Sequence, residues 1–209
     1  MTLYEKYILP PLLNCLCSSK PVTRQRQKVL PNASGTVLEV GIGSGLNIPF
    51  YDASRVDRVI GLDPSLELNA LAQCVAASHS VAVDFLIGDA QAIDLPSNSV
   101  DTVVVTYTLC TIPDALSACR EMSRVLKPSG RLVFCEHGLA PDASVARWQA
   151  RIDPFWGMFA GGCHLNRDIP RLLDDAGFVL ENLEQMYLPS TPRFAGYNFW
   201  GIAAVGEHQ

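Results

Sequence analysis

The sequence predicts an α/β fold with one doubly wound parallel sheet. Strand-like apolar runs alternate with helical patterns from residue 36 onward, which is typical of a parallel sheet with helices on both faces. A glycine-rich turn follows the first apolar run directly, as in sheets that bind a ligand at the end of that strand. The chain has 209 residues, of which 48% are hydrophobic, so it can bury the core of one domain.

Seven apolar runs predict the strands of this sheet. Continuous apolar runs rich in β-branched residues suit strands that are buried on both faces. Two final runs follow one another without a helix between them, so we expect them to pair antiparallel. The predicted strands are residues 36–40, 58–62, 83–87, 102–107, 131–135, 178–188 and 197–205.

Helical patterns fill the gaps between these runs. We expect helices over residues 65–77, over residues 114–126, and from about Asn166 to Gly177, where the glycine is suited to end a helix. The segment 138–165 fits the alternation poorly. An insertion after a central strand lies over the carboxyl edge of the sheet, where ligands bind in such folds.

The chain therefore divides into an N-terminal helical cap, residues 1–35, and the sheet domain, residues 36–209, with an insertion at about 138–166. The stretch from Tyr7 to Cys17 is apolar, but it is too short to span a membrane and Pro10 interrupts it. It suits either a short helix that covers an active site or one that lies on a membrane surface. We favour the first, because a covering helix needs no basic flank.

Charge and cysteine content narrow the function classes. The net charge is −5 and the chain has no long basic run, so we expect no nucleic-acid partner. The seven cysteines are odd in number and include no CxxC pair, so their spacing predicts no metal site. Most lie in apolar segments, which indicates reduced thiols and a cytoplasmic protein. No signal peptide is recognisable, since Glu5 and Lys6 interrupt the N-terminus early.

The strongest motif is the glycine loop Glu39-Val-Gly41-Ile-Gly43-Ser-Gly45. Glycines let the backbone approach a ligand closely and adopt positive φ. A dinucleotide fingerprint would need a glycine where Leu46 stands, and no phosphate-binding Lys-Ser/Thr pair follows. The loop is therefore a cofactor loop of another kind.

Acidic residues stand at the ends of the next two strands. Asp63, before Pro64, follows the second strand, where a carboxylate can accept hydrogen bonds from both ribose hydroxyls. Asp89, before Ala90, follows the third strand, where a carboxylate can accept a hydrogen bond from an adenine amino group. Each acid alone would suit a helix N-cap, but the loop and both acids in this order indicate a nucleoside-binding site.

These features, together with residues 95–101 and 124–130, resemble the class I S-adenosylmethionine (SAM)-dependent methyltransferases of the type 11 group. The resemblance covers roughly residues 37–138. It implies a Rossmann-like sheet of seven strands in the order 3-2-1-4-5-7-6, with the last strand antiparallel. Thr106 stands at the end of the fourth strand, where class I enzymes commonly contact SAM or the methyl acceptor.

The resemblance also implies the cofactor contacts. SAM would lie on the glycine loop and leave as S-adenosyl-L-homocysteine. Asp63 would contact the ribose, and Asp89 with Ala90 the adenine, while Pro64 is a further cofactor-binding residue. Glu39 would lie near the methionine portion of SAM.

The C-terminal half resembles a bacterial group similar to the thiol S-methyltransferases of animals. The residues that carry this resemblance lie at 136–138, 148–156, 162–167 and 176–178. It implies a small-molecule methyl acceptor, with a thiol or sulfide favoured. Some bacterial proteins of this type are phospholipid N-methyltransferases, so a phospholipid or quinone acceptor is the alternative. A SAM-binding regulatory protein is the alternative of another class.

Polar residues near the expected acceptor side are candidates for catalysis. A thiol reacts as its thiolate, so a nearby base or cation promotes the reaction. His137, just past the fifth strand, and His164, in the insertion, could each be a general base near neutral pH. Arg167 and Arg26 are candidate cations, and Cys163 could bind a soft acceptor. A hydrogen-bonded structural role is the alternative for each histidine.

Aromatic side chains of the insertion predict an apolar pocket wall, although core packing explains them equally well. They are Trp148, Phe155, Trp156 and Phe159. Binding of a metalloid would need several convergent thiols. Cys110 and Cys135 stand near the same sheet edge as Cys163, but both lie in apolar runs that favour core packing.

Overall fold

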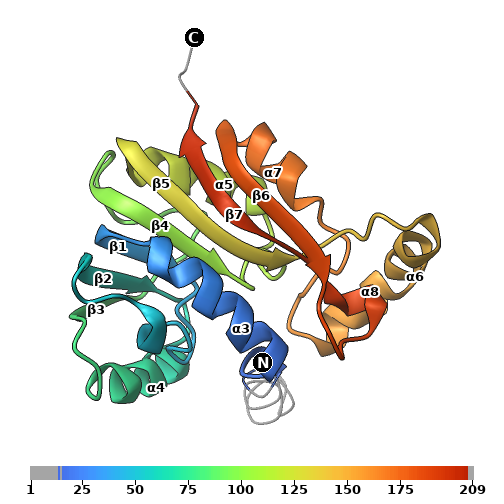
Figure 1. Ribbon diagram of the computed structural model, residues 1–209, viewed down its shortest axis with the longest axis horizontal. Coiled ribbons are helices and arrows are strands. Elements are labelled where there is room, and N and C mark those ends of the chain that lie inside the picture. Colours follow the sequence, from blue (N-terminus) through green and yellow to red (C-terminus); the bar gives the residue numbers. More distant parts are fainter. Residues whose placement is uncertain (1–13, 15, 207–209) are drawn as a thin grey trace.

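The computed structural model describes residue 14 and residues 16–206. Seven strands make up its sheet: β1 (Gly35–Val40), β2 (Val56–Leu62), β3 (Val83–Leu86), β4 (Val100–Thr106), β5 (Leu126–His137), β6 (Phe178–Tyr187) and β7 (Tyr197–Val205). Their order is β3-β2-β1-β4-β5-β7-β6 (Figure 1). Strand β7 runs antiparallel to β5 and β6, whereas the other neighbours pair in parallel. Both the predicted order and the antiparallel last strand are confirmed.

Helices and short 3₁₀ turns connect the strands. The helices are α3 (Lys20–Val29), α4 (Leu66–Ala76), α5 (Ala115–Val125), α6 (Ala143–Phe159), α7 (Ile169–Asp175) and α8 (Arg193–Gly196), and the turns are η1 (Leu30–Asn32) and η2 (Ile48–Phe50). Side chains of Ser65, Asp114 and Asp168 cap the first turns of α4, α5 and α7 by accepting backbone N–H groups. Helix α7 begins later than expected from Asn166, because Asp168 is its cap. Gly177, with φ +85°, follows its end as predicted.

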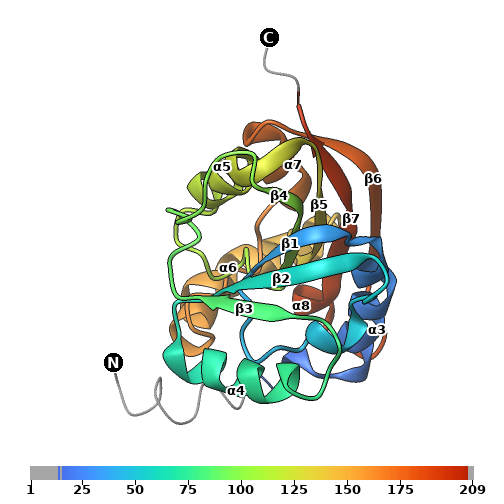
Figure 2. The same ribbon diagram turned by 90° about the vertical axis from the view of Figure 1, so that its left-hand side faces the viewer.

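The core forms on both faces of the sheet. On one face, Val29 of α3 packs with Val133 and Trp200 of the central strands. On the other face, Met122 of α5 and Leu173 of α7 pack against the sheet. Figures 1 and 2 show α3 on one side of the sheet and α5 and α7 on the other. This arrangement leaves the carboxyl edge of the parallel strands to the connecting loops.

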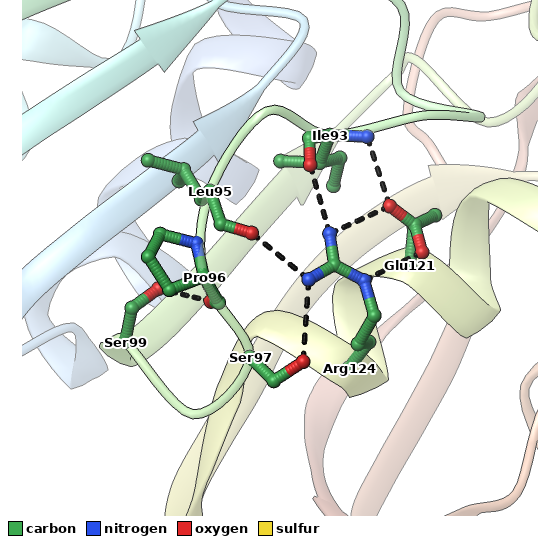
Figure 3. A network of polar contacts seen from close by, with 7 residues as sticks. All are labelled: Ile93, Leu95, Pro96, Ser97, Ser99, Glu121 and Arg124. Carbon is green, nitrogen blue, oxygen red and sulfur yellow. Dashed lines mark hydrogen bonds and ion pairs between the residues drawn. The ribbon is translucent and has the colours of Figure 1, made fainter.

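A charged network joins the segment that contains Leu95 to the end of α5 at Arg124 (Figure 3). Arg124, on α5, donates hydrogen bonds to the carbonyl oxygens of Leu95 (2.9 Å) and Ile93 (2.8 Å), and it also pairs with Glu121. Glu121 in turn accepts the backbone N–H of Ile93 at 2.9 Å. One arginine thus holds the loop between β3 and β4 against α5.

The insertion contains α6 and is fixed by one buried amide. The Nε2 atom of Gln149 lies 3.0, 2.9 and 3.0 Å from the carbonyl oxygens of Gly138, Leu165 and Phe194. Its Oε1 atom accepts the N–H of Ala140 at 2.9 Å. Gln149 therefore ties α6 to the end of β5, to the end of the insertion and to α8.

The prediction that aromatic side chains of the insertion form the wall of a pocket is largely wrong. Trp156 packs against Cys110 and Cys163, but the other three aromatic side chains of the insertion are mostly exposed: Trp148 (60%), Phe155 (64%) and Phe159 (65%). They lie on the outer face of α6, because the buried Gln149 and Asp153 define its inner face.

Most of the predicted covering segment, Tyr7 to Cys17, falls outside the described residues. Of the N-terminal cap, the structure describes residue 14 and residues 16–35, which include helix α3 and turn η1. The division into a cap and a sheet domain stays a prediction. Among the described helices, none is both long and apolar enough to cross a lipid bilayer.

Candidate active site

The glycine loop forms the floor of a cavity at the carboxyl edge of β1. Gly41, Gly43 and Gly45 all have left-handed backbones, with φ of +74°, +55° and +81°. A Cβ atom on Gly41 would lie 2.3 Å from the Thr108 side chain, and one on Gly45 would lie 2.8 Å from Ile48. A Cβ on Gly43 would find its nearest atom 3.9 Å away. Gly41 and Gly45 are thus needed for packing, whereas Gly43 leaves its backbone open to a ligand.

Asp63 connects the end of β2 to this loop. Its Oδ2 atom accepts the N–H of Gly43 at 3.0 Å, and its Oδ1 atom accepts the N–H of Ser65 at 2.9 Å. The side chain is largely buried, and burial raises the pKa of this carboxyl. Because each carboxylate oxygen has a second lone pair, Asp63 can still accept hydrogen bonds from a pair of ribose hydroxyls.

Glu39, the last acid before the loop, lies in a buried polar network. It accepts hydrogen bonds from the Asn47 amide (2.9 Å) and the Tyr51 hydroxyl (2.7 Å). Burial raises the pKa of Glu39 to about 7, against the opposing effects of the Tyr51 bond and the Arg26 charge. Sequence reasoning missed both donors. Asn47 could have been found from the sequence, because it stands directly after the glycine loop, but no sequence pattern identifies Tyr51 as a partner of Glu39.

Arg26 reaches the same cavity from α3. Its guanidinium donates to Asn47 (2.8 Å) and to the Thr106 hydroxyl (2.7 Å), and it lies 5.3 Å from the centroid of the Tyr107 ring. Arg26 is only 5% exposed. Its Nε atom finds no hydrogen-bond acceptor within the described part of the chain. A buried cation therefore lines the cavity, close enough for its charge to act on Glu39, and that charge favours an anionic ligand group in the cavity.

The cavity brings together five of the predicted cofactor residues: Glu39, Gly41, Gly43, Asp63 and Thr106. Gly45, Pro64, Asp89 and Ala90 do not line it. The carboxylate of Asp89 is exposed and accepts hydrogen bonds from the backbone and side chain of Gln91. Its contact with adenine stays a prediction.

The far side of the cavity is formed by the loop after β4. Tyr107 has a left-handed backbone with φ +54°, a conformation that is uncommon for a bulky residue and is often found at functional sites. Its hydroxyl donates to Asn198 at 2.7 Å. Cys17, Thr108 and Thr111 also line the cavity here.

Glu136 supports this loop from the end of β5. One carboxylate oxygen accepts the backbone N–H groups of Thr108 (2.8 Å) and Leu109 (3.1 Å). The second oxygen is buried and finds no donor among the described residues. Burial raises the pKa of Glu136 to about 7.

Next to Glu136, a thiol and imidazole cluster joins three separate segments. The Sγ atom of Cys163 lies 3.3 Å from the Nε2 atom of His137, and Cys110 completes the cluster. A hydrogen bond from Cys110 and the neighbouring His137 hold the pKa of Cys163 well below its ordinary value. Burial alone would lower the pKa of His137, but the hydrogen bond with Cys163 and the charges of Cys163 and Glu136 together raise it.

The other two predicted catalytic residues hold the insertion in place. His164 Nδ1 lies 2.8 Å from the carboxylate of Asp153, and the backbone N–H of His164 donates to Cys110. Arg167 donates to the carbonyl of Ile112 at 2.6 Å. None of the four predicted catalytic residues lines the cavity, His137 and Cys163 included, so their catalytic roles stay predictions.

The chain is similar to several known methyltransferases. A family profile described as a methyltransferase domain matches residues 38–134. The thiol S-methyltransferase TMT1B of Homo sapiens is 32% identical over 205 residues, covering 92% of this chain and 83% of the relative. A phosphatidylethanolamine N-methyltransferase of Cereibacter sphaeroides is 33% identical over 136 residues, covering 62% of this chain and 66% of the relative.

A solved complex between the Haloferax volcanii Trm112 methyltransferase activator and a methyltransferase contains a chain of the same fold. It aligns with a TM-score of 0.72 and 17% identity, covering 99% of this chain and 97% of that one. The sheet order, the glycine loop and the sequence relatives lead to one family. The chain belongs to the SAM-dependent methyltransferases of the type 11 family, with the class I fold.

Proposed function

We propose that this methyltransferase transfers the methyl group of SAM to the sulfur of a small thiol or sulfide. The observation that carries the proposal is the likeness to human thiol S-methyltransferase TMT1B along 92% of the chain. A continuous alignment of that length has to include the insertion at 138–166 as well as the cofactor loop. The likeness therefore extends to the acceptor side of the site.

The residues present fit SAM. The open backbone at Gly43 and the carboxylate of Asp63 suit the nucleoside, and the positive charge of Arg26 in the cavity wall suits the carboxylate of the methionine portion. Glu39 lines the same cavity, and its ionised form, which is favoured above its pKa of about 7, suits a cationic cofactor. When bound, SAM supplies a methyl group activated on a sulfonium. The protein then has to align the acceptor sulfur with that methyl group and exclude water.

Arg26 also favours a thiolate acceptor in this cavity. Cys17 lines the cavity, and the charge of Arg26 lowers the pKa of its thiol, although burial raises that pKa more strongly. A substrate thiol in the same space would feel the same positive charge. Since the thiolate is the nucleophile, Arg26 promotes the reactive form without acting as a base.

A phospholipid acceptor is the second candidate. The likeness to the Cereibacter sphaeroides phosphatidylethanolamine N-methyltransferase favours it. So does the outer face of α6, where Trp148, Phe155 and Met158 are each at least 60% exposed and Arg151 lies 6.0 Å from the Trp148 ring. An apolar face with adjacent cations is suited to a lipid surface.

The release of S-adenosylhomocysteine, measured against a panel of acceptors, tests the proposal. The panel contains sulfide, alkyl thiols, phosphatidylethanolamine vesicles and a quinol. We expect turnover with sulfide or thiols alone. Asp63→Ala should reduce turnover with every acceptor by weakening SAM binding, whereas Asp52→Ala, at an exposed carboxylate outside the cavity, should not. Turnover with vesicles or quinol alone would refute the thiol acceptor, and tight SAM binding without any turnover would favour a regulatory protein.

A further inference from the structure

The thiol and imidazole cluster has the composition of a site for a soft metal ion. Cys110 lies in the loop after β4, His137 ends β5, and Cys163 lies in the turn after α6. One atom from each, two sulfurs and a nitrogen, lie within 4.8 Å of one another. Thiolate and imidazole together are the ligands that Zn²⁺ takes in proteins, and they disfavour Mg²⁺ and Ca²⁺.

The distances suit tetrahedral coordination. With Zn–S of about 2.3 Å and Zn–N of about 2.0 Å, ligands in a tetrahedron lie about 3.5 Å apart for sulfur and nitrogen and about 3.8 Å apart for two sulfurs. The sulfur of Cys163 and the Nε2 of His137 are already 3.3 Å apart. Small side-chain rotations would therefore place all three ligands around one ion.

The backbone holds these three residues in position. The carbonyl of Cys110 accepts the N–H of His164 at 2.8 Å, which joins the loop after β4 to the insertion. Gly161 and Gly162 have left-handed backbones, with φ of +62° and +82°, and turn the chain so that Cys163 follows the end of α6. Trp156 packs against both cysteines. These contacts position the three residues independently of the contact between Cys163 Sγ and His137 Nε2.

We propose that Cys110, His137 and Cys163 bind one thiophilic divalent cation, Zn²⁺ or an ion of similar chemistry, and leave its fourth position open toward the cofactor cavity. Sites with three protein ligands and an open position are typical of catalytic rather than structural zinc. None of the three residues lines the cavity itself, but the Sγ atom of Cys110 lies 3.8 Å from the carbonyl oxygen of Tyr107, which does. The cluster therefore adjoins the cavity through the loop after β4.

The open position gives the ion a role that rests on the proposed thiol acceptor. The substrate thiol would bind the ion as a thiolate and release its proton to solvent, because coordination by a metal ion deprotonates a thiol. The thiolate sulfur would then form a bond to the methyl carbon. The bond between that carbon and the sulfonium would break, with its electron pair kept by the sulfur of S-adenosylhomocysteine. The neutral thioether product is a weaker ligand and would leave.

Cobalt(II) is the probe for this site, because its absorption spectrum reports ligand type and geometry. We expect the full chain to bind one equivalent of Co²⁺ with a thiolate-to-metal charge-transfer band and tetrahedral ligand-field bands. Cys163→Ser and Cys110→Ser should each weaken binding by at least tenfold or abolish the band. Cys74→Ser, at an exposed cysteine on α4, is the matched control and should leave the spectrum unchanged. Absence of the band, or an unaltered band in Cys163→Ser, would overturn the proposal.

A second measurement needs no variant and so does not depend on how the variants fold. Zn²⁺ should protect Cys163 and Cys110 of the unaltered chain from alkylation by iodoacetamide, as read by mass spectrometry, while Cys74 stays reactive. Equal alkylation with and without Zn²⁺ would overturn the site.

The two proposals fail in different ways. Undiminished thiol methylation by chelator-treated, metal-free protein would refute the role of the ion and leave the thiol acceptor in place. A Co²⁺ spectrum with thiolate bands, but no turnover of any thiol, would support the site and refute the acceptor.

Discussion

Replacement of Gln149 by methionine tests how the insertion is held. Methionine has nearly the same length but cannot bond the N–H of Ala140 or the carbonyls of Gly138, Leu165 and Phe194. The amide side chain can satisfy one N–H and at least two carbonyls. Each buried backbone group that loses its partner costs about 1–2 kcal/mol, so we expect the free energy of unfolding to fall by about 3–5 kcal/mol.

Urea unfolding measures this loss, and hydrogen exchange locates it. Amides of residues 138–166 should exchange faster in Gln149→Met. Those of β1 and β4 should not, because neither strand bonds to the Gln149 side chain. Gln73→Met, at an exposed position of α4, makes the same substitution without such bonds. The reasoning would be refuted if Gln149→Met were as stable as Gln73→Met and if exchange in the insertion were unchanged.

Three further predictions concern charged residues. Burial raises the pKa of Glu39 to about 7, so the folded state binds this proton more tightly than the unfolded state does. The free energy of unfolding should therefore fall by about 3 kcal/mol as the pH rises from about 4.5 to 7. Glu39→Gln should remove that decrease in urea unfolding, and an identical slope would contradict the prediction; Glu136, whose pKa burial also raises to about 7, adds a decrease of its own that the substitution leaves in place. Arg124→Ala should cost about 2–3 kcal/mol by removing two bonds to loop carbonyls and the bonds to its acidic neighbour. Arg58→Ala, in the exposed ion pair with Asp84, should cost less than about 1 kcal/mol, and equal losses would argue against the loop network. Arg26→Lys keeps the positive charge but loses the planar guanidinium that donates to Asn47 and Thr106. Titration calorimetry should therefore show SAM binding weakened about tenfold. Unchanged affinity would show that Arg26 does not contribute to the cofactor site.

The strands could be predicted because buried parallel strands leave continuous apolar runs. Residues 102–107 and 131–135 identify β4 and β5, although the structure begins β5 earlier, at Leu126. Helix starts were predictable where a capping side chain stands before the helix, as at Asp114. The exposed side of α6 was not predictable, because Trp148 and Phe155 break the expected division into apolar inner and polar outer faces.

The cofactor side of the site was more predictable than the acceptor side. The glycine loop and Asp63 lie next to one another in the structure as expected, since the carboxyl ends of β1 and β2 meet at one edge. Cys110, His137 and Cys163 lie in three separate segments, so rules based on short spacing do not detect their convergence. The sequence order places Cys110 and Cys163 near the same sheet edge, but the fold is needed to show that both reach His137 at the end of β5.

The most direct test of the central claim is to identify the methylated product. SAM with a deuterated methyl group is incubated with the protein and equal amounts of an alkyl thiol and phosphatidylethanolamine vesicles, and the products are separated by mass spectrometry. The account predicts the labelled methyl thioether, formed together with S-adenosylhomocysteine in equal amount. Label in the lipid headgroup and none in the thioether would contradict it.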